Sequence, residues 1–573
     1  MKKPWLRHAM KETLPLLLRI SEPPSISPAI AAAGSPLPPW SIAGRVRLPV
    51  VVLVLLGCLA ACDRQVDPIG PTEATAEAPA TPPDARQTAA MLGADESPEH
   101  SSRSVPATPA ALRLEDAVWT ALQRNGDLRI ERLRGAEAIA FVAIERGRYD
   151  LILAANAEVG RQRSSETARS TGERFDVEAG DQAVGVGLQK AFATGTELGL
   201  RLEQERNDSD RTPRQVETSV GLSLTQALLR GFGPAVNLAA VRQAEIGVQA
   251  SRFELQGYLS RLVATVEATY WRLTLAEVVL AAARADEELA VAEGAATQSV
   301  VELGAAATSE LLAAERRQTE AQQELSRRRE DVEQLRRQMA RLLDLPPSQS
   351  DAITLATSLP PVWQDDAVVE QRLALALQQR PDLAEARLRL QQRRLATRVT
   401  RNGLLPRLDF FIDLDKTGFA ERSGAAIEDL DGSSYDLRAG LSFEWSLSGR
   451  LERGRHQQAV AGQQQAELAV AHLEVQVAHD LHQALARLAR RQDRLAAAET
   501  LLAIRRREAE QVLLRQAQGL TTDIDGQRAA ARVTIAQAAV AQAQVDLRLA
   551  ELELYEAEGS LLDRRGIIAS QRL

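Results

Sequence analysis

Residues 380–414 read RPDLAEARLRLQQRRLATRVTRNGLLPRLDFFIDL, and this stretch predicts a helix that passes directly into a β-strand. Arg380-Pro381 opens a charged helical run, because proline is tolerated in the first turn of a helix. Leu405-Pro406 ends that run. The residues that follow alternate in hydropathy, so four apolar side chains share one face of the predicted strand: Leu408, Phe410, Ile412 and Leu414.

An earlier part of the chain repeats this unit. Asn125-Gly126-Asp127-Leu128 corresponds to Arg380-Pro381-Asp382-Leu383, and Arg148 precedes Gly403 by the same offset. No insertion therefore separates the two copies of this helix. An internal duplication of this length predicts one architecture built twice rather than several unrelated domains.

The two copies are predicted to differ in their strands. Four segments of alternating hydropathy lie between residues 149 and 231, but only two lie between residues 405 and 449. We therefore expect one additional hairpin in the first copy.

Each copy then continues as a helical hairpin. The segment from Gly449 to Gly519 alone would form about 100 Å of helix at about 1.5 Å per residue. Long helices with narrow alanine-rich stripes need neighbours, so we expect self-association.

Composition excludes several classes of function. The formal net charge of −8 over 573 residues is mild, so we expect no nucleic-acid partner. The two cysteines, Cys58 and Cys62, cannot form a disulfide framework for the rest of the chain. The sequence contains no catalytic arrangement, no phosphate-binding glycine loop and no convincing set of metal ligands. We therefore expect neither an enzyme nor a cofactor.

The N-terminal region is typical of an exported protein. Residues 48–61 form an apolar stretch that is too short to span a bilayer but suits a signal-peptide core. Leu59-Ala60-Ala61-Cys62 resembles a bacterial lipobox, in which the cysteine is lipidated and becomes the mature N-terminus. Cys58 is an overlapping alternative, and an ordinary secretory signal cleaved near Ala61 is a third interpretation. Residues 63–110 contain almost no large apolar side chains and are predicted to form a tether.

The predicted strands suit a membrane wall. In residues 197–203, ELGLRLE, the leucines face one side and the glycine and charged residues face the other. Such alternation is expected of a β-barrel with lipid outside and water inside. A soluble sheet with one wet face would show the same alternation. The export signal and the very long helices favour the barrel.

Four motifs, in order, carry a resemblance to a known family. They are Arg380–Leu383 with Leu405–Leu408, the junction Leu224–Gly233, its counterpart Phe443–Arg450, and the turn Gln518–Asp525. From about residue 112 to residue 562 the chain resembles the TolC-like outer-membrane efflux proteins. The resemblance implies an α+β membrane protein, in which a homotrimer closes one outer-membrane β-barrel that continues as a periplasmic α-barrel.

The resemblance also implies partners and a function. Small molecules or proteins would leave passively through the lumen of a tripartite efflux or type I secretion system, in a Gram-negative-type envelope. A periplasmic adaptor protein and an inner-membrane transporter would deliver them, and outer-membrane lipid would surround the barrel. Family protomers give four strands, so the additional hairpin either enlarges the wall or lies outside it. The alternative function is a structural coiled-coil envelope lipoprotein without channel activity.

The tips of the helical hairpins are the predicted functional residues. Glu310 and Asp525 each follow a tip glycine by six residues, and the resemblance places them in rings of carboxylates that form a cation-favouring gate. Asp523 would add to the ring, and Arg528 would pair with an acid in the closed state. Alternatively, these acids only stabilise helix N-termini. The tip glycines, Gly304 and Gly519, are the expected adaptor contacts.

These observations predict six segments. They are an N-terminal extension with a lipoprotein signal peptide (1–62), a tether (63–110), a first efflux repeat (111–344), a connector (345–361), a second efflux repeat (362–562) and a C-terminal tail (563–573).

Overall fold

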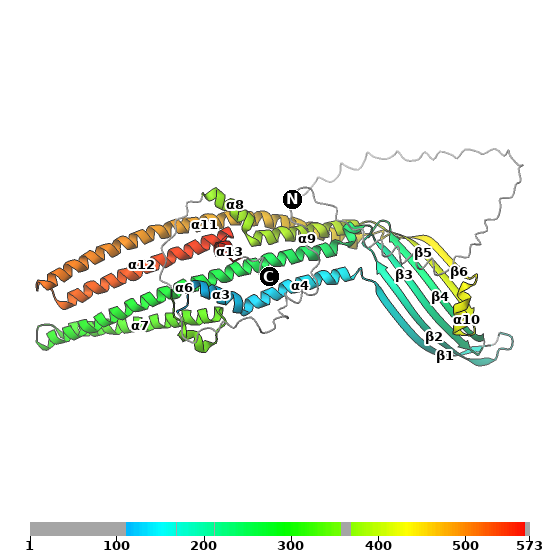
Figure 1. Ribbon diagram of the computed structural model, residues 1–573, viewed down its shortest axis with the longest axis horizontal. Coiled ribbons are helices and arrows are strands. Elements are labelled where there is room, and N and C mark those ends of the chain that lie inside the picture. The colour runs from blue at the N-terminus through cyan, green and yellow to red at the C-terminus, as the bar shows by residue number, and fades with distance from the viewer. Residues whose placement is uncertain (1–110, 168, 211, 357–367, 568–573) are drawn as a thin grey trace, which may run out of the picture. The chain divides into compact units, whose positions relative to one another are not determined.

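A computed structural model describes residues 111–167, 169–210, 212–356 and 368–567 of the chain (Figure 1). The predicted signal peptide, Cys58, Cys62 and the tether lie outside the described residues, so lipidation stays a prediction. The same holds for the segment boundaries proposed above.

Each repeat begins with a short and a longer helix separated by a break. In the first repeat these are α3 (Leu114–Arg124) and α4 (Gly126–Gly147), and the Asn125 side chain caps α4 by accepting a hydrogen bond of 2.9 Å from the Leu128 N–H. In the second repeat they are α8 (Val369–Gln379) and α9 (Pro381–Gly403). Both breaks lie where the sequence predicts them, because a cap residue or a proline starts the second helix.

Long helical hairpins complete both repeats. The first consists of α6 (Ala239–Glu302) and α7 (Thr308–Leu342), and the second of α11 (Arg450–Ala517) and α12 (Asp523–Glu558). α11 has 68 residues, which is about 100 Å of helix. The shorter helices are α5 (Pro234–Asn237), α10 (Ser423–Glu428), α13 (Leu561–Arg564), η1 (Pro347–Ala352) and η2 (Asp429–Asp431). None of the described helices has an apolar stretch long enough to cross a bilayer.

The helices pack as rows of four neighbours. Near the sheet, α4 lies beside α6, α6 beside α9, and α9 beside α11; nearer the hairpin tips the row is α7, α6, α12 and α11 (Figure 1). The main core lies where α3, α6, α7 and α12 meet, around the fully buried Tyr270, Leu273 and Met339. The Trp271 ring packs edge-on to Tyr270, with centroids 5.4 Å apart.

The C-terminal end is fastened to this core by ion pairs. Arg565 donates two hydrogen bonds of 2.7 Å to the buried Glu267 carboxylate on α6. Glu558, which is fully buried at the end of α12, pairs with Arg372 of α8. Removing one member of such a buried pair would leave an uncompensated charge, so both pairs must stay intact. They hold Glu558 and Arg565 against α8 and α6.

The strands form a single antiparallel sheet in the order β1-β2-β3-β4-β5-β6. The first repeat supplies four strands and the second supplies two, which confirms the predicted numbers; they are β1 (Ile152–Thr167), β2 (Arg174–Ala191), β3 (Thr196–Ser209), β4 (Thr212–Ala227), β5 (Arg407–Ala420) and β6 (Tyr435–Glu444). α10 packs on β4 and β5 where the small Gly418 leaves room for its backbone. The α+β class with a duplicated helix-and-strand repeat is therefore confirmed.

Candidate functional site: the sheet wall and the helical tips

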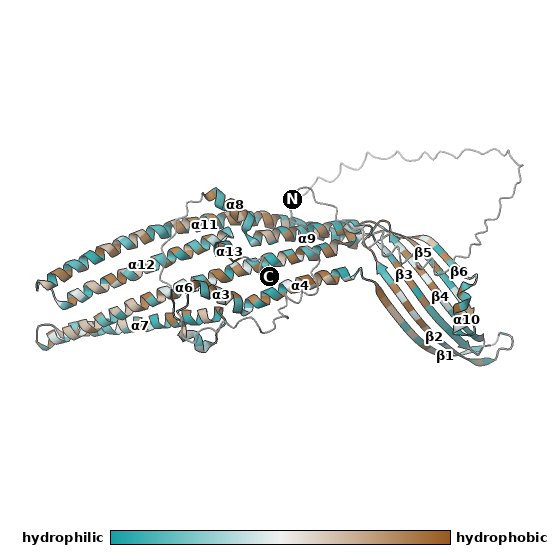
Figure 2. Cartoon of the chain, in the orientation of Figure 1, coloured by the Kyte–Doolittle hydropathy of each residue, from teal (hydrophilic) through white to brown (hydrophobic). Residues whose placement is uncertain are grey.

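One face of the sheet carries an apolar row that crosses all six strands. The register places one leucine of every strand side by side on the same face: Leu153, Leu188, Leu200, Leu222, Leu414 and Leu437. Directly paired residues on neighbouring strands share a face, so these leucines form a continuous row, the leucine row. Leu153 is 69% exposed and Leu437 is 59% exposed at the two edges. Figure 2 shows the alternation of apolar and polar residues along the strands.

Further apolar residues widen this row into a band. Val186, Leu202 and Val220 lie two residues along their strands from the row, and Phe443 and the neighbouring Trp445 are exposed at the helical end of β6. In β1 the apolar residues continue from the leucine row toward the strand end that is remote from the helices. In β6 they continue from the row toward the helices. Such a drift along successive strands is expected if the strands are tilted relative to the band, as in a closed barrel.

The opposite face of the sheet is polar. Stepping one residue along each strand from the leucine row reaches six residues that are also paired side by side: Ala154, Gly187, Arg201, Gly221, Asp415 and Asp436. A shallow hollow of about 450 Å³ lies on this face, lined by Arg201, Asp413, Asp415 and Arg438 among others. Arg201 lies 3.8 Å from Asp415 and 3.7 Å from Glu203. The sheet therefore has the two faces that a wall between lipid and water requires.

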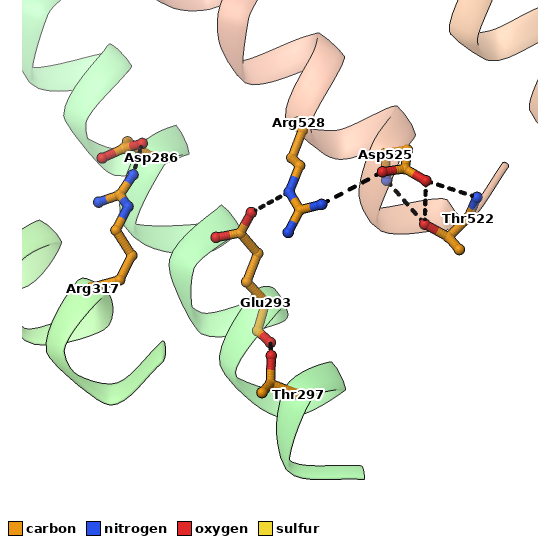
Figure 3. Close-up of polar contacts among 7 residues, drawn as sticks. All are labelled: Asp286, Glu293, Thr297, Arg317, Thr522, Asp525 and Arg528. Carbon is orange, nitrogen blue, oxygen red and sulfur yellow. Dashed lines mark hydrogen bonds and ion pairs between the residues drawn. The ribbon is translucent and has the colours of Figure 1, made fainter. Parts of the chain in front are cut away.

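The second helical tip is closed by a capping box. The Asp525 N–H donates to the Thr522 Oγ1 (3.3 Å), while the Thr522 N–H donates to the Asp525 Oδ2 (3.2 Å) (Figure 3). The Thr522 hydroxyl also donates to the Asp525 Oδ2 at 2.7 Å. These hydrogen bonds and, secondarily, the nearby Arg528 guanidinium lower the pKa of Asp525 below its usual value.

Arg528 connects this tip to the other repeat. Its Nε lies 2.6 Å from the Glu293 Oε1 on α6, and its Nη1 lies 3.5 Å from the Asp525 Oδ1 (Figure 3). Glu293 is mostly shielded, with 20% of its side chain exposed, whereas 49% of the Arg528 side chain is exposed. A parallel contact holds the first hairpin together, where the Arg317 guanidinium of α7 donates to the Asp286 carboxylate of α6 at 2.6 Å. This hydrogen bond raises the pKa of Arg317.

Comparisons with known proteins agree with this arrangement. Residues 373–560 match the family of outer membrane efflux proteins. The match lies within the second repeat. No curated protein matches the whole sequence significantly.

Solved structures resemble a larger part of the chain in fold. The outer-membrane channel OprN has a TM-score of 0.57 at 20% identity, over 78% of this chain and 90% of its own. The Campylobacter jejuni CmeC outer membrane channel has a TM-score of 0.59 at 15% identity, over 80% and 89%. The open state of the Neisseria gonorrhoeae MtrE outer membrane channel has a TM-score of 0.54 at 19% identity, over 81% and 94%. The chain therefore has the fold of these outer membrane channels.

The predicted gate residues Glu310 and Asp525 occupy equivalent positions in their two helices, but their surroundings differ. Glu310 and Asp525 are each the third residue of their helix, as their spacing from the tip glycines predicts. Asp525 is engaged by Thr522, but α7 is preceded by Ala307, which has no capping side chain. Asp523 accepts a hydrogen bond of 2.7 Å from Gln516 and is exposed. Asp525 thus stabilises a helix start whether or not it also forms part of a gate.

The two tip glycines lie in the turns as expected. Gly304 has φ +75° and Gly519 has φ +72°, in the left-handed region that favours glycine, and open space surrounds both. Sequence reasoning missed the leucines next to them. Leu303 is 83% exposed and Leu520 is 69% exposed, so each tip presents an apolar side chain to its surroundings.

Two further features of the tips were missed. Glu293 was not predicted, because nothing local distinguishes it from the other glutamates of α6 and its partner lies 235 residues away. The capping box, in contrast, has a sequence signature, because Thr522 precedes the acidic Asp525 by three residues. That spacing alone predicts a helix start at Asp523.

Proposed function

We propose that three copies of this chain form an outer-membrane channel of a tripartite efflux or type I secretion system. The observation that carries this proposal is the sheet with the leucine row on one face and charged residues on the other. Lipid would contact the leucine row, and the exported molecule would pass along the face that bears Arg201 and Asp415. The efflux-family match of residues 373–560 supports the same function.

Assembly follows from the edges of the sheet. β1 and β6 each pair on one side only among the described residues, so both offer free backbone N–H and C=O groups. An unpaired edge is untenable within a bilayer, because no water is present to satisfy it. Pairing of β6 with β1 of the next copy removes both edges. A homotrimer, as in the family that the chain resembles, would close the wall, with the helices continuing it into the periplasm.

The helical tips would then form the periplasmic gate. Arg528 joins the tip of the second hairpin to Glu293 of the first, and Glu310, Asp523 and Asp525 line the two tips. A half-exposed ion pair contributes only about 0.2–1 kcal/mol. A contact of this strength holds the closed arrangement weakly enough for a partner to open it. The excess of carboxylates favours cations at the entrance.

The tips are also the proposed site for partners. Gly304 and Gly519 leave the backbone of each turn uncovered, and Leu303 and Leu520 add exposed apolar surface. We infer that a periplasmic adaptor binds here and connects the channel to an inner-membrane transporter. Lipidation at Cys62, or alternatively Cys58, would anchor the chain to the membrane.

The test is a planar-bilayer recording of the purified full-length protein, with gel electrophoresis of unheated and heated samples. The proposal expects heat-resistant trimers and discrete single-channel currents that favour cations. A structural coiled-coil lipoprotein, the alternative function, would give elongated helical particles and no conductance. Absence of currents from reconstituted trimers, including trimers of the Arg528→Ala variant, would contradict channel activity.

A further inference from the structure

We propose that the hairpin of β2 and β3 is part of the membrane wall, so that three copies of the six-stranded sheet close a barrel of eighteen strands. The inference rests on the proposed function and deepens it, because it sets the width of the pore. The first repeat has four strands and the second has two. The proposal assigns a role to the hairpin that makes this difference.

Strand pairing continues through this hairpin from β1 to β4. β1 pairs with β2 over its whole length, from Ile152 opposite Gln189 to Thr167 opposite Arg174. β2 pairs with β3 from Ala191 to Ala179, and β3 pairs with β4 with one register shift, between Asn207 and Ser209. A hairpin outside the wall would leave β1 next to β4. In this sheet only the hairpin connects them.

The hairpin also carries both faces of the wall. Leu188 and Leu200 supply its two members of the leucine row, and Val186 and Leu202 continue the apolar band. Arg201 lies on the polar face with Asp415 of β5, at 3.8 Å. A hairpin that projected into water would have no reason to keep its apolar side chains in line with those of β4 and β5.

The turn of the hairpin is docked at the junction of sheet and helices. The Asn237 side chain of α5 donates to the Ala193 carbonyl at 3.0 Å, and the Gly233 N–H donates to the Thr194 carbonyl at 3.0 Å. Gly195 has φ +86°, and a Cβ there would lie 2.3 Å from the Gly231 carbonyl oxygen. The turn therefore approaches the β4–α5 connection as closely as glycine permits, which fixes β2 and β3 in place.

The width of such a wall matches the helices beneath it. With strands about 4.8 Å apart and tilted by about 40°, eighteen strands have a circumference of about 110 Å, and twelve have about 75 Å. The helical row next to the sheet has four members per chain, α4, α6, α9 and α11. Twelve helices about 9 Å apart also give about 110 Å. Six strands per chain thus continue the helical tube without narrowing it.

Cysteine accessibility tests the position of the hairpin. Leu202→Cys and Arg201→Cys place thiols on adjacent residues of β3 that face opposite sides. With the protein in lipid vesicles, a water-soluble maleimide should label Arg201→Cys about tenfold or more faster than Leu202→Cys, because only the polar face meets water. Mass spectrometry of the strand peptide reads the label, so that Cys58 and Cys62 do not contribute.

Matched controls come from β5. Leu414→Cys lies in the leucine row and Asp415→Cys lies on the polar face, so this pair should show the same contrast. In the unfolded, detergent-solubilised chain all four thiols should react alike. Equal labelling of Leu202→Cys and Arg201→Cys in vesicles, together with contrast in the β5 pair, would overturn the inference while leaving the channel proposal intact.

A shortened chain tests the width. Replacement of residues 164–211 by Asn-Gly joins Arg163 to Thr212 through a two-residue turn and keeps Leu153 opposite Leu222. The variant would close with twelve strands and about two-thirds of the diameter. In an Arg528→Ala background that opens the tips, it should exclude smaller polyethylene glycols than the parent. The same size limit in both would overturn the inference. If the shortened chain does not assemble, the labelling contrast still decides.

Discussion

The Arg528 Nε lies 2.6 Å from the Glu293 Oε1 and thereby joins the tip of the second helical hairpin to α6 of the first (Figure 3). The two residues are 235 positions apart, and the pair joins the two repeats near the tips. If the tips must separate for passage, this pair must break.

Replacement of Arg528 by alanine should raise the closed-state current. The substitution removes both the Glu293 pair and the weaker Asp525 contact, so about 0.2–1 kcal/mol of closed-state stability is lost and open probability rises up to about fivefold. Single-channel recording measures the change. Arg316→Ala is the matched control, since it removes an ion pair of 2.6 Å within α7 alone. An unchanged open probability for Arg528→Ala would show that the pair does not hold the gate.

The same pair should respond to salt. Both side chains are partly in contact with solvent, so added salt screens their attraction. Open probability of the wild type should therefore rise as salt increases from about 0.1 M to about 1 M, where the screening length falls from about 10 Å to about 3 Å. The Arg528→Ala channel should show a flatter dependence. A parallel salt response in the two proteins would argue against the pair as its origin.

The second tip should resist acidification. Hydrogen bonds from Thr522 lower the pKa of Asp525, so its ionised form is favoured in the folded tip. The resulting stability is present above the pKa of the unfolded carboxyl, about 3.9, and is lost only as the pH falls through the lower folded value. Hydrogen exchange of the α12 N-terminus against pH measures the loss. Thr522→Ala should shift the loss to higher pH and cost about 1 kcal/mol locally, whereas Thr522→Ser should retain the cap.

Acid pH should stabilise the other end of α12. Burial, and secondarily the nearby Glu553, raise the pKa of Glu556 to about 7. A raised pKa means that folding takes up a proton, so this contribution to stability is greatest below the ordinary carboxyl pKa and falls as the pH rises to about 7. Glu556→Gln should raise the melting temperature at pH 8 more than at pH 5. The exposed Glu320→Gln should leave the difference between the two pH values as in the wild type.

Lipidation should depend on one cysteine. If Cys62 is the modified residue, Cys62→Ser abolishes incorporation of radiolabelled palmitate, while Cys58→Ser leaves it unchanged. Metabolic labelling followed by immunoprecipitation makes this measurement. The reverse pattern would assign the anchor to Cys58. Absence of label in the wild type would indicate an ordinary secretory signal.

The sequence by itself determined the local features of this protein. Chemistry within a few residues explains the helix breaks at Asn125 and Arg380, the left-handed tip glycines and the alternation along the strands. The internal duplication gives the order of the elements. For the same reason the positions of Glu310 and Asp525 at their helix starts were predictable. Capping, turn conformation and periodicity act over one or two turns of chain.

Only the tertiary structure decided how distant segments meet. It paired Arg528 with Glu293, placed β2 and β3 within the sheet, and brought one leucine from each of six strands into a single row. These relationships depend on strand register and helix packing between residues up to hundreds of positions apart. A shift of one residue in register would move every leucine of a strand to the other face. Between β4 and β5 no short turn sets the register, because the two strands come from different repeats. The faces of the wall were readable strand by strand, but their alignment is a property of the folded sheet.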